Sequence, residues 1–172
     1  ERNFIFPEYD LSTSLSNAEW LISTGSIEVN ASSDEIHSVY SLSNNFYNWD
    51  FISNSFSLDL NTKTINAKGV PDIQVADAYI IPENEELYIR EGFQILPLSN
   101  SVLVLDTINE FHRFVNSNVS VLTKDKFEGK GVYEYVNFDL DTFNIPFSQF
   151  ELKNGNNNHC LLYTSDAADD LI

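Results

Sequence analysis

Short segments in which apolar and polar residues alternate, each closed by turn-forming residues, recur along most of this chain of 172 residues. The stretch "FSLDL" places Phe56, Leu58 and Leu60 on one face of an extended strand and polar residues on the other. The same alternation resumes in "TINAKGV" after the turn residues 61–63, which predicts a β-hairpin. No stretch keeps helical spacing over several turns, so we predict an all-β fold.

The other segments of this kind are short, rich in β-branched and aromatic residues, and bounded by Pro, Asn, Asp, Ser or Gly. They are "AEWLIS", "SIEVNA", "IHSVYSL", "DIQVADAYII", "EELYIRE", "FQIL", "SVLVLD", "EFHRFV", "NVSVLT", "GVYEYV", "DTFNIPF" and "SQFEL". The Ser-rich residues 1–45 show the weakest pattern. We therefore expect a poorly defined N-terminal part over 1–45, a β-rich repeat-like domain over 46–153, and a disordered tail over 154–172.

A faint internal repeat runs through this pattern. An apolar residue is followed after one position by Asn or Asp and then by Ala or Ser; the segments are 15–20, 75–80 and 98–103, with a looser copy at 115–120. The interval from Ala78 to Ser101 is 101 − 78 = 23 residues, and from Ser101 to Asn118 it is 118 − 101 = 17. Such lengths suit one coil of a β-solenoid, so we predict a parallel β-helix-like solenoid segment with a hairpin. An antiparallel β-sandwich explains the alternation equally well and stays open.

The charge of the chain is strongly acidic, with a formal net value of −17 and only nine Lys and Arg, which are scattered. Nucleic-acid binding needs clustered basic residues, so we expect no nucleic-acid partner. No run of apolar residues is long enough for a membrane-spanning helix. This composition fits an extracytoplasmic bacterial protein of the periplasm or cell surface, although an acidic cytosolic protein would look similar.

The end of the chain reads differently from the rest. Residues 160–169, "CLLYTSDAAD", resemble the translation of a sequencing-library adapter; the alternative is a genuine acidic tail. On the first interpretation residues 160–172 are artefactual and pack against nothing. Removing them also removes Cys160, the only cysteine, and changes the net charge to −14 because they carry three Asp and no Lys or Arg. The chain contains no Met, so we expect it to be an internal piece of a longer protein.

A wider resemblance covers residues 52–152. The stretches "FSLDLNTKTINAKGVPDIQVADAYIIPENEELYIREG", "SNSVLVLDTINEFHRFVNSNVSVL" and "FEGKGVYEYVNFD" resemble segments of large, β-rich envelope proteins of Gram-negative bacteria. The resemblance lies in the overall residue pattern and not in a catalytic motif, and it implies a location in the cell envelope. It supplies no site residues.

Two groups of residues are candidates for catalysis. Asp139 and Asp141 in "NFDLDTFN" would share one face of a strand at roughly 6.6 Å between Cα atoms, a spacing that suits a glycosidase pair or a cation site. Glu110 and His112 in "NEFHRF" would also share a face, giving a carboxylate that could orient an imidazole. Paired acids beside a turn are more often simply solvated, and "NEFHRF" is also typical of a buried strand.

A third group is a candidate for carbohydrate binding. In "NNFYNWDF", Tyr47 and Trp49 offer rings to sugar C–H faces, and Asn48 offers an amide to the hydroxyls. The alternative is an aromatic core plug that closes one end of the β structure. We predict no metal site and no cofactor, since the three His are isolated and no phosphate-binding loop is present.

The function that these observations favour is a non-catalytic structural or interaction segment of a larger extracytoplasmic bacterial β-repeat protein. Its partners would be other segments of the same protein. The alternative is a carbohydrate-binding or glycan-active module, a hydrolase or lyase, with glycans as partners.

Overall fold

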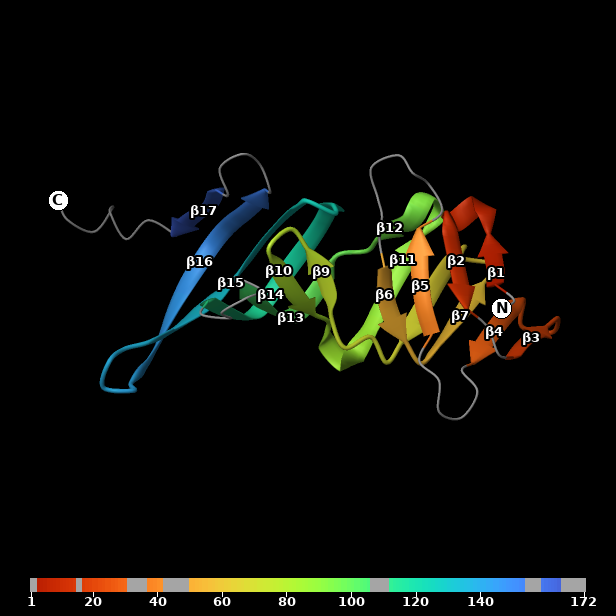
Figure 1. Ribbon diagram of the computed structural model, residues 1–172, viewed down its shortest axis with the longest axis horizontal. Helices are drawn as coiled ribbons and strands as arrows, with labels where there is room; N and C mark the ends of the chain where they lie inside the picture. The colour runs from red at the N-terminus through yellow and green to blue at the C-terminus, as the bar shows by residue number, and fades with distance from the viewer. Residues whose placement is uncertain are drawn as a thin grey trace. The chain divides into compact units, whose positions relative to one another are not determined.

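The computed structural model describes residues 3–14, 17–30, 37–41, 50–105, 112–153 and 159–164 (Figure 1). In these ranges the secondary structure consists of β-strands and short 3-10 helices, with no α-helix, so the all-β prediction is confirmed. The chain divides into two compact units. Unit 1 comprises residues 1–73 and 81–96, and unit 2 comprises residues 74–80 and 97–172. The boundary expected at 45/46 falls inside unit 1.

Unit 1 contains two antiparallel sheets. Sheet A has the order β1-β2-β5-β6, and sheet B has the order β12-β11-β8-β7-β4-β3. The strands of sheet A are β1 (Asn3–Phe6), β2 (Leu11–Ser14), β5 (His37–Ser41) and β6 (Asp50–Ser53). The strands of sheet B are β3 (Asn17–Leu21), β4 (Ser26–Asn30), β7 (Ser55–Asp59), β8 (Thr64–Lys68), β11 (Glu86–Arg90) and β12 (Gln94–Ile95). The 3-10 helices of this unit are η1 (Pro7–Tyr9), η2 (Glu83–Glu85) and η3 (Glu91–Phe93).

The hairpin predicted at residues 56–70 is present as β7 and β8. These strands pair antiparallel from Ser55↔Lys68 to Asp59↔Thr64. Phe56 and Leu58 are buried as the alternation requires, whereas Leu60 is exposed because it already belongs to the turn.

Aromatic rings join the two sheets of unit 1. The ring of Phe6 in β1 meets that of Phe56 in β7 edge to face at 5.7 Å between centroids. Phe51 in β6 meets Phe93 in η3 at 6.2 Å, also edge to face. These rings and the buried aliphatic residues of β4, β7, β8 and β11 form the core of unit 1. Buried and partly exposed positions alternate along β7 and β8.

The pairing in both units corrects the solenoid prediction. The strand pairs with a described register are antiparallel, which fits a β-sandwich better than a parallel β-solenoid. The physical reason is the connection length: only residues 124–125 join β14 to β15, and so short a link can only reverse the chain.

Unit 2 is built on one antiparallel sheet, sheet C, of order β17-β16-β15-β14-β13-β10-β9. Its strands are β9 (Ile73–Val75), β10 (Ala78–Ile81), β13 (Leu98–Leu105), β14 (His112–Thr123), β15 (Lys126–Val136), β16 (Thr142–Lys153) and β17 (His159–Thr164). Residues 112–115 of "EFHRFV" and all of "NVSVLT", predicted as two strands, belong to β14, and residues 142–147 of "DTFNIPF" and all of "SQFEL" belong to β16. Long strands of this kind form long hairpins in place of solenoid coils.

A row of β-bulges crosses sheet C, and we call it the bulge row. The register shifts between Leu98 and Ser101 in β13 and between Val115 and Asn118 in β14. Asn100 and Asn116 at these shifts have φ of +49° each, a left-handed conformation that Asn tolerates better than most residues. Two of the segments that suggested solenoid coils, 98–103 and 115–120, are therefore bulges in neighbouring strands.

Small residues fill the bulge row. Ser101 and Ser117 face each other across β13 and β14 and are fully buried, and the Ser101 hydroxyl donates to the Ser117 carbonyl oxygen at 3.0 Å. On β15, a Cβ at Gly129 would overlap the carbonyl oxygen of Asn118 and lie 2.8 Å from the Phe150 ring. The neighbouring backbone therefore approaches β15 too closely for a side chain at this position.

The last described strand departs from expectation. Residues 159–164 form β17, which pairs with β16 from Lys153↔His159 to Phe147↔Thr164. An open strand edge offers free N–H and C=O groups to any β-prone segment, and "CLLYT" is such a segment whatever its origin. The expectation that residues 160–172 adopt no structure is thus wrong for 160–164, while 165–172 lie outside the described residues.

We predict that Gly129→Ala destabilises unit 2 by about 1–3 kcal/mol, because the added methyl group meets a carbonyl oxygen that cannot move without shifting β14. Gly→Ala usually stabilises a site that tolerates Ala, so the sign of the change is diagnostic. Urea unfolding followed by tyrosine fluorescence measures it. Lys130→Ala, an exposed neighbour on β15, is the control, and equal stability of the two variants would contradict the prediction.

A second prediction concerns the turn between β7 and β8. The Asp59 carboxylate accepts hydrogen bonds from the Thr62 hydroxyl at 2.8 Å and from the backbone N–H of Asn61 and Thr62 at 2.8 and 3.3 Å. These bonds, that of the Thr62 hydroxyl foremost, lower the pKa of Asp59. The stabilisation is therefore complete above the unfolded pKa of about 3.9 and is lost as the pH falls through the lower folded pKa.

The measurement is the free energy of unfolding of the wild type and Asp59→Ala from about pH 7 to about pH 3. The difference in free energy of unfolding between the wild type and Asp59→Ala should become smaller at acid pH. The exposed carboxyl of Asp139 gives the control, Asp139→Ala. A gap for Asp59→Ala that stays constant over this range would refute the role of the carboxylate.

Candidate functional site

The hairpin of β15 and β16 continues past the strands on either side of it. Strand β14 pairs with β15 as far as Glu134, and β17 pairs with β16 only from Phe147 onward. Between these points neither outer edge of the hairpin has a partner strand in the described part of the chain. We call residues 133–147 the arm; its outer part, residues 135–146, lies in the blue ribbon that projects beyond β14 and β17 in Figure 1.

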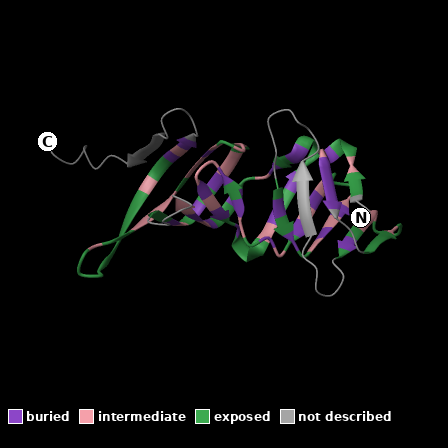
Figure 2. Cartoon of the chain, in the orientation of Figure 1, coloured by how far each residue is buried: buried purple, intermediate pink, exposed green. Residues whose placement is uncertain are grey.

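One face of the arm is aromatic. The register Tyr133↔Ile145 and Tyr135↔Phe143 places these four side chains on the same side of the ribbon. Tyr135 is 46 % exposed and Phe143 is 50 % exposed, and their rings lie 6.4 Å apart. In most sheets the apolar face produced by alternation packs on a core. In the arm this face is largely exposed (Figure 2).

This aromatic face is continuous with the core of unit 2. Phe114 in β14 is buried and contacts Tyr133 at 5.1 Å, Phe147 at 5.8 Å and Phe150 at 5.2 Å between ring centroids. Phe150 in turn meets Phe127 at 6.2 Å. A single row of rings thus begins in the core and runs out along the arm.

Polar contacts fix the base of the arm. The Tyr133 hydroxyl and His112 Nδ1 share a hydrogen bond of 2.9 Å, and Arg113 Nε lies 3.4 Å from a Glu134 carboxylate oxygen. His112, a predicted site residue, is exposed at the start of β14, and Glu110, its expected partner, lies outside the described residues. The imidazole is therefore paired with a phenol that the sequence analysis did not single out.

The tip of the arm contains the predicted acid pair. Asp139 and Asp141 are exposed in the loop between β15 and β16, so the expectation that they share a face of a strand is wrong. The loop is closed by Asn137, whose N–H donates to the Asp141 carbonyl oxygen at 3.0 Å and whose side-chain oxygen accepts from the Asp141 N–H at 2.8 Å. Phe138 is fully exposed and Leu140, with φ of +67°, is 82 % exposed.

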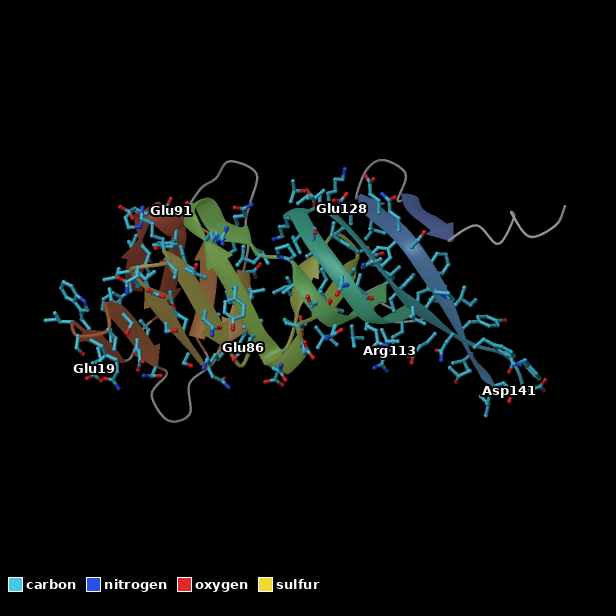
Figure 3. All side chains as sticks on the ribbon, turned by 180° about the vertical axis from the view of Figure 1, so that it is seen from behind. Glu19, Glu86, Glu91, Arg113, Glu128 and Asp141 are labelled. Carbon is cyan, nitrogen blue, oxygen red and sulfur yellow. The ribbon has the colours of Figure 1, made fainter. Side chains whose placement is uncertain are left out.

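The arm carries charge of one sign. Between Lys130 and Lys153 the sequence contains no Lys or Arg, and the arm itself contains three acids, Glu134, Asp139 and Asp141. Figure 3 labels Asp141 at the far end of the hairpin and Arg113 near its base. An aromatic face with an acidic tip therefore distinguishes the arm from the rest of sheet C.

Each unit also has a hollow on its surface. In unit 1 a cleft of about 390 Å³ lies beside Phe6, Tyr9 and Lys63. The Tyr9 ring is buried, and this burial, together with the nearby Glu91 carboxylate, raises the pKa of its phenol. The Lys63 ammonium is paired with Glu91 at 2.9 Å. The Phe6 ring already packs edge to face against Phe56.

The hollow of unit 2 is a groove of about 350 Å³ across β13 to β16. Its lining includes Asn118, Ser120, Glu128 and Lys130 and contains no aromatic residue. Hydrogen-bonding groups without a ring to stack against are a weak basis for sugar recognition.

Other predicted residues remain untested by the structure. Tyr47, Asn48 and Trp49 lie outside the described residues. Phe51, from the same segment, is buried against Phe93. Among the described residues no group of three or more His, Cys, Asp and Glu is placed to hold a metal ion.

Comparison with protein-family models, curated proteins and solved structures finds no match for this chain. In the described residues, no helix has the length and apolar character needed to span a bilayer.

We predict that rings on the arm and rings in the core differ sharply in their contribution to stability. Phe143→Ser should change the free energy of unfolding by no more than about 0.5 kcal/mol, because the side chain is half exposed. Phe114→Ala should lower it by about 3–5 kcal/mol, because it leaves a cavity among three rings. Thermal unfolding measures both. A large loss for Phe143→Ser would mean that the arm face is covered in solution.

Proposed function

We propose that this chain is a non-catalytic interaction segment of a larger extracytoplasmic bacterial β protein, with unit 1 as a β-sandwich scaffold and the arm as the binding element. The partners would be other segments of the same protein. The observation that supports this proposal is the aromatic face of the arm, in which Tyr135 and Phe143 are about half exposed. Contiguous exposed apolar surface of this kind is typical of interaction sites.

The energetics of a two-stranded ribbon favour a docked arm. An isolated hairpin is at best marginally stable in water, and the outer arm lacks neighbouring strands among the described residues. Complete burial of a large apolar side chain stabilises by about 1.5–3 kcal/mol, so covering the half-exposed rings of Tyr135 and Phe143 and the flanking Ile145 would contribute a few kcal/mol. That gain would be available only when a partner covers the face.

The carboxylates of the arm fit this role better than they fit catalysis. Asp141 takes part in closing the tip loop through Asn137, and both Asp139 and Asp141 face solvent. The alternative, a carbohydrate-binding or glycan-active module, rests on Tyr47, Asn48 and Trp49 and stays a prediction because these residues are not described.

Hydrogen exchange provides the test. The longer protein is expressed from the extended reading frame of the source DNA, and amide exchange of residues 135–146 is compared with that in the present chain alone. We expect at least about tenfold slower exchange in the longer protein, because docking would add about 1.4 kcal/mol or more to the local opening free energy.

The β7–β8 hairpin is the internal control and should exchange at the same rate in both proteins. Equal exchange of the arm in the two proteins would reject the arm as the binding element.

A further inference from the structure

The unpaired strand edges of the arm limit how a partner can bind it. This inference rests on the proposed function. On β15 only Tyr135 and Val136 extend beyond the pairing with β14, which is too short for strand addition. On β16 the free stretch is Thr142–Pro146, and Pro146 has no N–H to donate to an added strand. The edges are therefore poor docking sites, and the aromatic face is the surface that remains.

The charge of the arm indicates which kind of partner can bind its aromatic face. The arm carries three acids and no Lys or Arg, and the whole chain has a net charge of −17. A second copy would bring the same acids against each other, and an anionic membrane would repel them. A basic surface would gain attraction to Asp139 and Asp141 at the exposed tip, while Glu134 already pairs with Arg113.

We infer that the arm docks by the exposed part of its aromatic face, Tyr135, Phe143 and Ile145, into an apolar groove on another segment of the same larger protein, and that the rim of this groove carries Lys and Arg. The rings enter the groove, and the acidic tip pairs with the basic rim. Apolar burial gives most of the affinity, and the charges set the choice of partner.

Synthetic peptides of alternating sequence test both parts of the inference. The probe is a ten-residue peptide of alternating Lys and Leu, whose extended form has one apolar and one basic face; matched peptides replace Lys by Gln or by Glu. Binding to the full chain is measured by isothermal titration calorimetry at two salt concentrations. The wild type should bind the Lys–Leu peptide more tightly than the other two.

Two variants separate the arm from the general charge of the chain. Tyr135→Ser with Phe143→Ser leaves the net charge unchanged and should weaken binding of the Lys–Leu peptide at least about tenfold, or about 1.4 kcal/mol. Trp20→Ser removes another exposed ring, on β3, and should leave the affinity unchanged. Asp139→Asn with Asp141→Asn should weaken binding severalfold and reduce its dependence on salt. Circular dichroism checks that each variant is folded.

Different failures have different meanings. If the Gln–Leu peptide binds the arm as tightly as the Lys–Leu peptide, the basic partner is wrong while the arm remains an interaction surface. If the serine double variant binds like the wild type, attraction to the net charge explains the binding, and docking by the aromatic face is wrong. Arm-dependent dimerisation in sedimentation, or arm-dependent binding to phosphatidylcholine vesicles in place of the peptide, would overturn the inference in favour of a second copy or a lipid surface.

Discussion

The close approach of β14 and β15 at the bulge row is the constraint on which unit 2 depends. Gly129 lies where a Cβ would overlap the Asn118 carbonyl oxygen, and Ser117 fills the corresponding space opposite Gly131. Bulges bend a sheet and increase its twist. Phe114, Phe127 and Phe150, which lie on the strands of this row, are all buried.

The same geometry explains why the arm exists. The rings of unit 2 lie on one face of β14, β15 and β16, and that face is buried at Phe114, Phe127 and Phe150 but about half exposed at Tyr135 and Phe143. Beyond Glu134 the covering stops, yet the alternation of apolar and polar residues continues to the tip. The arm thus continues the residue pattern of the buried strands into a region that is exposed to solvent. A partner that packs on its aromatic face would bury the exposed rings.

Two kinds of polar contact give the exposed parts a defined shape. In unit 1 the Asp59 carboxylate organises the β7–β8 turn, and the Asn61 side chain donates to the Thr24 carbonyl oxygen of the β3–β4 turn at 3.1 Å. In unit 2, Asn137 closes the tip loop. Short polar side chains that bond to nearby backbone groups compete with ladder pairing and end the strands at defined positions.

Local pattern in the sequence was sufficient for the strands, the hairpin of β7 and β8, and the acidic character, because alternation and turn residues act over a few positions. Local pattern did not show in which direction the strands outside this hairpin pair. The Asn-Ser pairs at 100–101 and 116–117 looked like solenoid corners and are bulges, since a left-handed Asn serves either structure.

Burial likewise depends on what lies opposite a face. Tyr133 and Phe143 occupy similar alternating positions in the sequence, but Phe114 packs on Tyr133, whereas Phe143 contacts Tyr135 and stays half exposed. The sequence by itself determined which segments are strands and which sign of charge they carry. Only the tertiary structure decided that the strands outside the predicted hairpin also pair antiparallel and that an aromatic face is left half exposed, because pairing and burial are set by residues far apart in the chain.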